Sequence, residues 1–404
     1  MFKAEAPKLI AGLTRIVRDV GTAEELSQDA LVAALEQWPA SGIPDNPGAW
    51  LMSAGKNRAI NVLRRGKMLA RRHEQLGHEI ETEHALSAVD VEAAIDNAPV
   101  ADDLLRLVFI SCHPVLTVES RVALTLRLLG GLTTDEIARA FLTTEPTIAQ
   151  RIVRAKRTLR EADVPFEVPR GAELTERLSS VLGVIYLVYN EGYSATAGDD
   201  YMRPQLCADA IRLGRMLAEL APDEPEVHGL LALMELQSSR TAARTDATGE
   251  PVLLLDQDRS AWDRALVTSG LASLARAGEG PYGLQAAIAA CHARADRAED
   301  TDWSGIAALY GRLVAIMPSP VVELNRAVAV AMAEGPAAGL AIVDDLANEP
   351  ALARYHLLPS ARADFLKKLG RVEEAKREFE RAASLTKNAR ERDLLLKRAA
   401  ACAS

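Results

Sequence analysis

The sequence lacks long apolar runs, and this absence excludes one large class of proteins. No stretch of roughly 18 or more consecutive apolar residues occurs, so no membrane-spanning helix is predicted. The amino-terminal segment MFKAEAPKLIAGLTRIVRD carries scattered charges and lacks the pattern of a secretion signal. We therefore expect a cytoplasmic protein that does not contact a membrane.

Cysteine is scarce as well. The four cysteines are far apart, form no CxxC pair and stand at Cys112, Cys207, Cys291 and Cys402. Buried thiols in a reducing compartment explain this pattern best, because neither Cys112–His113 nor Cys291–His292 has the ligand spacing of a metal site. The sequence also lacks a nucleophile elbow, a phosphate-binding loop and a dinucleotide-binding glycine motif. It therefore predicts no metal, no cofactor and no enzymatic activity.

The net charge of −9 argues against a protein that coats nucleic acid, but the charges are unevenly distributed. Residues 56–72 contain seven Lys or Arg and no acidic residue. Residues 79–103 contain eight Asp or Glu and no Lys or Arg. A basic block followed by an acidic block predicts different functions for the two segments.

Apolar residues recur through most of the chain at the spacing of helices, and few segments alternate as strands do. We therefore predict an all-α fold, and the length of 404 residues predicts two or three domains. Composition places a first domain at 1–75, an acidic linker at 76–103, a second small domain at 104–165 and a helical extension at 170–404.

Two amphipathic helices are predicted in the first domain, at 23–38 and 49–67. The apolar face of the first is formed by Leu26, Ala30, Leu31, Ala34 and Leu35. The second is basic on one side, and its apolar side is formed by Trp50, Leu51, Ala54, Ile60 and Leu63. We place Trp50 in the core rather than on the surface as a base-stacking wedge. The segment 39–48 has three prolines and two glycines and is predicted as a loop.

The stretch TTDEIARAFLTTEPTIAQRIVRAKRTLRE, residues 133–161, predicts two short helices. Thr133 and Glu136 form a capping box at the start of the first helix. Thr144 can cap the second, and Pro146 is tolerated in its first turn. The buried sides are predicted to be Ile137, Ala138 and Phe141 on the first helix and Ile148, Ile152, Ala155 and Leu159 on the second.

The other face of the second helix offers hydrogen bonds and positive charge through Thr147, Gln150, Arg151 and Arg154. A helix with one buried face and one such face suits recognition in the major groove of DNA. Further along the helix, phosphate contacts are expected from Lys156, Arg157 and Arg160. The alternative is a solvated helical hairpin whose basic face binds nothing.

Three stretches together resemble the bacterial RNA polymerase sigma factors of the extracytoplasmic-function type. Their polymerase-binding helix is similar to VGTAEELSQDALVAALEQWP, and the segment that binds the −10 element is similar to NPGAWLMSAGKNRAINVLRR. The helix-turn-helix that binds the −35 element is similar to ALTLRLLGGLTTDEIARAFLTTEPTIAQRIVRAKRTLRE. Three further stretches are similar to a subgroup of this family with a long C-terminal extension: VIYLVYNEGYSA, ARTDATGEPVLLLDQDRSAWDRAL and GPYGLQAAIAACHARADRAEDTDW. The partners that this resemblance implies are core RNA polymerase and promoter DNA.

The resemblance also implies roles for individual residues. It assigns polymerase binding to Glu24, Glu25, Gln28 and Asp29. The −10 element is held by a loop residue and a helix face, through Asn46, Lys56, Asn57, Arg58, Asn61, Arg64 and Arg65. Capture of a single flipped base is expected there, because the helix has no row of exposed aromatic residues. The −35 element is read by Thr144, Thr147, Gln150, Arg151, Arg154 and Arg157.

The acidic linker has two interpretations. Its acids could mimic RNA in a basic polymerase channel, as the resemblance suggests, through Glu79, Glu81, Glu83, Asp90, Glu92 and Asp96. A disordered spacer is equally compatible with this composition.

The extension is predicted to contain helical repeats. Residues 357–386 resemble a tetratricopeptide repeat, and 303–347 resemble degenerate helical pairs. In the repeat, close approach of paired helices is expected at Ala363, Gly370, Ala375 and Ala382, with Phe379 packed between them. Such stacks form concave surfaces that bind partners.

Two polar clusters precede these repeats. The first comprises Asn190, Glu191, Gly192 and Tyr193, and the second comprises Asp246, Asp256, Asp258, Arg259 and Trp262. They predict either a regulatory surface for a protein or small ligand, or a capping network that fixes the extension to the sigma half. We expect Tyr193 to contact the sigma half.

Three functions follow as hypotheses. The first is a sigma factor that initiates transcription and whose activity is set by its extension. The second is a stand-alone helix-turn-helix regulator with a helical-repeat sensor. Such a regulator does not need the polymerase-binding helix and −10 segment within residues 21–72. The third, an enzyme using the region 190–193, needs a deep pocket with convergent acids.

Overall fold

The computed structural model describes residues 2–75, 100–141, 143–195 and 199–402. The predicted all-α fold is confirmed, because these residues form helices and no β-strand, apart from one isolated bridge between Thr245 and Pro251. The chain divides into two compact units, residues 1–185 and 186–404. The boundary lies within helix α9 (Ala172–Tyr193), and each unit is described separately below.

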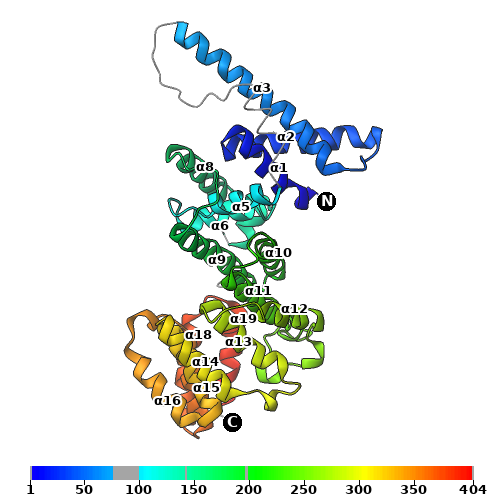
Figure 1. The fold of residues 1–404 in the computed structure, drawn as a ribbon. Coiled ribbons are helices and arrows are strands. Elements are labelled where there is room, and N and C mark those ends of the chain that lie inside the picture. Colours follow the sequence, from blue (N-terminus) through cyan, green and yellow to red (C-terminus); the bar gives the residue numbers. More distant parts are fainter. Residues whose placement is uncertain (1, 76–99, 142, 196–198, 403–404) are drawn as a thin grey trace. The chain divides into compact units, whose positions relative to one another are not determined.

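The first unit begins with three helices that pack on one another, α1 (Phe2–Val17), α2 (Val20–Ser41) and α3 (Pro47–Gln75) (Figure 1). Asp19 caps α2 by accepting a 2.7 Å hydrogen bond from the backbone N–H of Thr22. Helix α2 continues through Pro39 to Ser41, so the loop predicted at 39–48 is shorter than expected. Leu35, which was expected to face inward, is 61% exposed. Val32, on the same helix, is 52% exposed.

The contact between α1 and α3 depends on small residues that the sequence pattern did not reveal. Leu51, Gly55 and Ala59 are buried at four-residue spacing, whereas Trp50 and Ala54 of the predicted apolar face are only half-buried. A Cβ at Gly55 would lie 3.0 Å from a methyl carbon of Leu13 on α1. The buried side of α3 is therefore narrower and made of smaller residues than predicted.

Four further helices complete the second half of this unit, α5 (Val100–Ser111), α6 (Val118–Leu128), α7 (Thr134–Ala140) and α8 (Glu145–Glu161). Helix α5 begins at Val100, so the last residues of the predicted linker are helical, and it packs against α1. The start of α9 also belongs here, because Arg121 on α6 donates a 2.8 Å hydrogen bond to Ser180. The hydroxyl of Ser180 in turn donates to the carbonyl of Cys112, at 2.9 Å.

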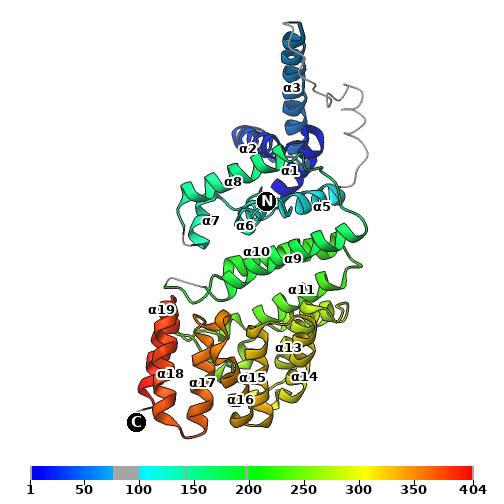
Figure 2. The ribbon, with the colours of Figure 1, turned by 90° about the vertical axis from the view of Figure 1, so that its left-hand side faces the viewer.

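The second unit contains α10 (Pro204–Leu220), α11 (Pro225–Ser238), α12 (Arg264–Leu274), α13 (Pro281–Arg294), α14 (Trp303–Ile316), α15 (Pro320–Glu334), α16 (Pro336–Asp345), α17 (Leu357–Lys368), α18 (Val372–Leu385) and α19 (Ala389–Ala400). From α13 onward, most consecutive helices pack side by side (Figure 2). Proline occupies the first position of α10, α11, α13, α15 and α16, where its missing N–H leaves no helical hydrogen bond unmade. Short 3₁₀ helices, including η1 (Thr241–Ala243), η2 (Leu254–Asp256), η3 (Arg259–Ala261) and η4 (Ala298–Asp300), lie between them.

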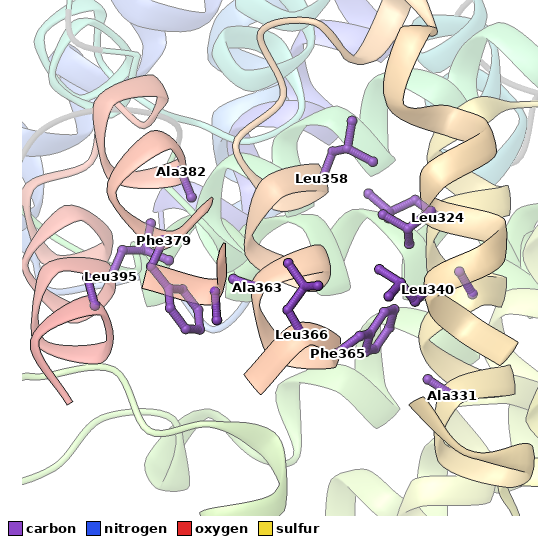
Figure 3. Close-up of a cluster of buried hydrophobic side chains, with 14 of the residues drawn as sticks. Leu324, Ala331, Leu340, Leu358, Ala363, Phe365, Leu366, Phe379, Ala382 and Leu395 are labelled. Carbon is purple, nitrogen blue, oxygen red and sulfur yellow. The ribbon is translucent and has the colours of Figure 1, made fainter. Parts of the chain in front are cut away.

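The predicted repeat at 357–386 is a helical pair, α17 and α18, with a shared apolar core (Figure 3). Ala363, Ala375, Phe379 and Ala382 are fully buried in it, as expected. Gly370 is not: it lies in the turn between the helices at φ +76°, where a Cβ would meet nothing within 4 Å. Its role is the left-handed backbone of the turn, which glycine adopts without steric cost.

Across the described ranges, no helix is long and apolar enough to cross a membrane. The four cysteines carry free thiols, of which Cys112, Cys207 and Cys402 are buried and Cys291 is half-buried. Within the same ranges, no group of three or more His, Cys, Asp or Glu side chains is arranged to hold a metal ion.

Candidate nucleic-acid interface

Helices α7 and α8 form the predicted pair of short helices, and their caps have the expected geometry. The backbone N–H of Thr133 donates to the Glu136 carboxylate at 2.7 Å, and that of Glu136 donates to the Thr133 hydroxyl at 3.1 Å. This reciprocal pair is the predicted capping box. Thr144 caps α8 by accepting from the N–H of Thr147, at 3.4 Å. Pro146 lies in the first turn of α8.

Helix α8 separates a buried side from an exposed one. Its buried residues are Ile148, Ile152, Ala155 and Leu159, which are the four predicted. On α7, Ile137 and Ala138 are buried, whereas Phe141, which was predicted on this helix, lies just after its end and is half-buried. Thr147, Gln150 and Arg154 are exposed and Arg151 is half-buried, so the predicted reading face is open to solvent. This face presents amide, hydroxyl and guanidinium donors, and the opposite face of the helix is packed in the core of the unit.

The basic residues further along α8 point in two directions. Arg157 is exposed, and its 3.4 Å ion pair with Glu161 joins two side chains that are each about two-thirds exposed, so the pair is weak. Lys156 and Arg160 instead bind carboxylates of α2 and its cap in the same unit. In this structure, then, Arg157 remains available for phosphate contacts while its two basic neighbours are engaged.

Asp19, at the start of α2, binds Arg160 through two parallel hydrogen bonds. The Nε and one Nη of Arg160 donate to its two carboxylate oxygens, both at 2.8 Å. Burial raises the pKa of Asp19, but the hydrogen bonds from Arg160 and Thr22 outweigh it and lower that pKa to about 2. Bidentate pairs of this kind are the stronger and more specific salt bridges.

Glu24, predicted to bind polymerase, is buried with only 4% of its surface exposed. It accepts a 2.6 Å hydrogen bond from Nε of Arg127 on α6 and pairs with Lys156 on α8. Burial raises the pKa of Glu24, and the charges of Lys156 and Arg127 reverse this, so that its pKa lies below the usual range. We call the contacts of Asp19 and Glu24 with Arg127, Lys156 and Arg160 the α2 ion pairs.

The remaining residues predicted to bind polymerase lie on the open side of α2. Glu25, Gln28 and Asp29 are exposed, and the exposed apolar Val32 and Leu35 follow them on the same helix. Sequence reasoning missed both Asp19 and Arg127. The α2 ion pairs join residues more than a hundred positions apart, and no local pattern in the sequence signals such pairing.

The residues predicted to hold the −10 element are spread along α3 and the turn before it. Exposed Asn46 caps α3 by accepting from the N–H of Ala49, at 3.0 Å. Asn57, Asn61 and Arg64 are exposed, whereas Lys56 and Arg58 are half-buried. The side chain of Arg65 lies outside the described residues, as do the six linker acids, Glu79 to Asp96. Half-buried Trp50 packs edge-to-face on buried Trp38, with ring centroids 5.5 Å apart, so it is partly in the core, less deeply than predicted.

In the second unit, the first polar cluster lies at the end of α9, and the second lies in and around η2 and η3. Tyr193 is stacked on Tyr189, and the guanidinium carbon of Arg244 lies 3.6 Å from the centre of its ring. Glu191 pairs with Arg203, Asp258 caps η3, and Asp256 is exposed. Trp262 is buried in an apolar cluster rather than offered at the surface. Asn190 accepts a backbone hydrogen bond from Ser194 at 2.9 Å.

Tyr193 was expected to contact the sigma half. The partners that the structure gives it, Tyr189, Arg240 and Arg244, are all residues of the second unit. The clusters therefore form a network of bonds, as the second interpretation predicted. These bonds join residues of the extension to one another.

Comparisons with known proteins match three segments of the chain. Residues 1–68 match the family model of sigma-70 region 2, residues 106–159 match sigma-70 region 4, and residues 177–278 match a family of unknown function, DUF6596. The sigma-70 matches cover the helices that carry the predicted −10 and −35 residues.

Individual relatives extend the comparison. The uncharacterized protein R00370 of Rhizobium meliloti is 45% identical over 390 residues, which are 95% of this chain and 91% of that protein. Over 167 residues, 40% of this chain and 82% of the relative, the sequence is 30% identical to the ECF RNA polymerase sigma factor SigK of Mycobacterium ulcerans. The yeast Tom70 crystal structure overlaps 95% of this chain and 80% of its own at 12% identity, with a TM-score of only 0.36.

The SigK relative is covered over most of its length, and both of the sigma-70 regions that the family models define are present in order. Together with the capped helix pair and its open reading face, these matches leave one family. The chain belongs to the extracytoplasmic-function (ECF) RNA polymerase sigma factors and carries a long helical extension beyond the two sigma regions.

Proposed function

We propose that this protein directs core RNA polymerase to specific promoters and initiates transcription there, with its activity set by the C-terminal extension. The observation that carries the proposal is the exposed face of α8 in a chain of the ECF sigma family. Thr147, Gln150 and Arg154 are exposed there, and four buried residues hold the helix from behind. Folding does not require donors in this arrangement, but reading base edges does.

For the −35 element, Gln150, Arg151 and Arg154 are the residues proposed to reach base edges, and Thr144, Thr147 and Arg157 to position the helix on the backbone. Arg and Gln side chains can each make two hydrogen bonds to one base in the major groove, which gives selectivity. Contacts to phosphate add affinity without selectivity.

For the −10 element, the proposed surface runs along α3 from Asn46 to Arg64. The exposed amides of Asn57 and Asn61 and the guanidinium of Arg64 lie within two turns of the same helix. Such a surface suits single-stranded DNA, because amides can bond unpaired bases and cations hold the backbone. The half-buried Trp50 takes no part in this account, since it packs on Trp38.

For polymerase binding, the proposed surface is the exposed side of α2. Glu25, Gln28 and Asp29 supply charge and hydrogen bonds, and Val32 and Leu35 supply apolar area at the surface. Exposed apolar residues beside acids fit a partner surface that is basic around an apolar centre. Glu24 becomes part of this surface only when its bonds to Arg127 and Lys156 break.

A mobility shift on promoter DNA, run with and without core polymerase, tests the proposal. The expected result is sequence-specific binding only when core polymerase is present. Arg154→Ala should weaken the shifted complex, whereas Arg377→Ala, at an exposed position of α18, should not. Tight, sequence-specific binding by the free protein, unchanged by polymerase, would instead support a stand-alone helix-turn-helix regulator.

A further inference from the structure

Three arginines of the extension are linked by their neighbours: Arg240 and Arg244 lie 5.6 and 3.6 Å from the centre of the Tyr193 ring, and the charges of Arg240 and Arg259 both act on His292. Arg240 ends the loop after α11, Arg244 follows η1, and Arg259 begins η3. Arg244 and Arg259 are buried, at 5% and 7% exposure, while Arg240 is half-buried. Among the described residues, none of the three forms an ion pair with a carboxylate, whereas buried Arg177 and half-buried Arg15 and Arg203 each do. Buried charges are normally paired.

Neutral groups take the place of carboxylates around these arginines. Arg244 donates to the backbone carbonyl of Tyr193 and, at 3.2 Å, to the hydroxyl of Tyr201. Arg259 donates to the carbonyls of His292 and Ala295, at 2.6 and 2.8 Å. These bonds orient the guanidinium groups but leave their positive charge uncompensated.

Several polar atoms at the same place have no partner. The Nε of Arg259 and the indole N–H of Trp262 are buried and make no hydrogen bond with any described residue, although the two side chains stack 4.9 Å apart. Trp262 is more than nine-tenths buried. The Nδ1 of His292 is likewise buried and unbonded within the described part of the chain. Buried polar atoms without partners are uncommon in folded proteins, and several within one cluster indicate a missing partner.

These groups belong to one region of the second unit. Ala243 of η1, Trp262 and Ala293 of α13 share an apolar cluster, and the N–H of Asp263 donates to the carbonyl of Ser239 at 2.7 Å. Burial lowers the pKa of His292, and the positive charges of Arg240 and Arg259 lower it further, to about 4. Arg240 also donates to the Tyr193 hydroxyl, and both of these side chains are partly exposed.

Three acids whose charges act on the cluster are bound elsewhere. Glu391, whose charge is felt by Arg244, accepts a 2.8 Å hydrogen bond from Thr386 and faces His356 at 3.1 Å. Asp300 and Glu299, whose charges act on Arg259, both bind Arg297: Asp300 through two hydrogen bonds, and Glu299 through a 3.3 Å ion pair. Each carboxylate is thus already committed to another partner.

We propose that Arg240, Arg244, Arg259 and Tyr193 form a binding site for an oxyanion, a phosphate or carboxylate group carried by a small ligand, which enters beside the partly exposed Arg240. Guanidinium groups bind both kinds of oxyanion through paired, charge-assisted hydrogen bonds. The ligand would neutralise a cluster that brings together the ends of α9, α11 and α13. The site lies wholly in the extension, so it stands or fails independently of promoter recognition by the sigma regions.

The test is calorimetric titration of the full-length protein with inorganic phosphate and, separately, with citrate, each against sodium chloride of equal ionic strength. We expect one saturable site, and preference for phosphate or for citrate distinguishes the two ligand classes. Arg240→Gln should weaken binding by about tenfold or more, since it removes a charge-assisted hydrogen bond. The matched control Arg377→Gln, at an exposed position of α18, should leave binding unchanged.

A second measurement uses the wild-type protein and therefore does not depend on how the variant folds. In NMR titrations, a saturating anion should raise the pKa of His292, because it screens the arginines that now lower it. Binding that chloride reproduces at equal ionic strength would overturn the proposal. So would a His292 pKa that neither phosphate nor citrate moves.

Discussion

Single residues decide what α8 can read. Three side chains, Gln150, Arg151 and Arg154, are proposed to reach base edges. Two other basic residues of α8 are already engaged: Lys156 binds Glu24, and Arg160 binds Asp19. The sequence showed the period of the buried and exposed stripes, but it did not distinguish exposed Arg157 from engaged Arg160. That distinction depends on Asp19, which is distant in the chain.

Replacing residues of the reading face should lower affinity for the cognate promoter and relax selectivity at the base pair that the residue contacts. Arg151→Ala or Gln150→Ala is expected to cost about 1–3 kcal/mol at one −35 base pair, because a base-edge contact is lost there. Arg157→Ala should weaken binding to all sequences alike. Affinities of the polymerase complex for a set of single-base promoter variants measure both effects, and uniform loss for both kinds of variant would show that the reading face is assigned wrongly.

Glu24 is expected to stabilise the first unit. Glu24→Ala should lower the free energy of unfolding by about 1–3 kcal/mol, because Arg127 and Lys156 lose their buried partner but can partly regain water. Glu25→Ala, at an exposed neighbouring position, should change it by less than about 0.5 kcal/mol. Urea unfolding of both variants checks this, and equal effects would mean that the ion pairs of Glu24 contribute nothing.

At the scale of elements, capping could be predicted closely and packing could not. The capping box at Thr133, the cap at Thr144 and the buried stripe of α8 all follow from local rules of spacing and hydrogen bonding. The α1–α3 contact does not, because Gly55 becomes a packing residue only when Leu13 lies against it. The exposure of Leu35 has a similar origin: its neighbours in space, not its spacing, leave it at the surface.

The cap of α8 can be separated from DNA binding. Thr144→Ala should destabilise the first unit by about 1 kcal/mol, since the N–H of Thr147 loses its acceptor, and Thr144→Asp should restore most of this. Thermal unfolding of the protein without DNA measures the cap alone. If Thr144→Ala unfolds as the wild type does, the hydroxyl of Thr144 makes no contribution as a cap.

The α2 ion pairs should also respond to acid. The pKa of Asp19 is about 2 in the folded protein, below its ordinary value of 3.8, so its ion pair stabilises the fold fully above about pH 4 and is lost as the pH falls toward 2. The free energy of unfolding should therefore fall more steeply below pH 4 in the wild type than in Asp19→Asn. Parallel pH profiles for the two proteins would contradict this assignment.

At the scale of the whole molecule, the family, the fold class and the helical repeats could be predicted from the sequence. Motif order and helical period are local properties that a single chain displays. The partners of Tyr193 could not be predicted: we expected the sigma half, but the described contacts are with Arg240, Arg244 and Tyr189 of the extension. Which residues compensate a given charge is set by the tertiary fold, and the sequence does not state it.

The extension is expected to set the activity of the sigma regions. The informative truncation ends at residue 185 rather than 165, because Arg177 and Ser180 of α9 bond to the α5–α6 region of the first unit. Removing 186–404 should change promoter-specific transcription strongly, in either direction. Identical transcription by the truncated and full-length proteins, with and without cell extract, would make the extension a passive passenger.

In vitro transcription with purified core RNA polymerase is the most direct test of the central claim. The full-length protein should support initiation from a defined set of promoters, and Arg151→Ala should change which −35 sequences are used while the Arg377→Ala control does not. Failure of the protein to direct core polymerase to any promoter, together with tight promoter-specific DNA binding by the protein alone, would contradict the account.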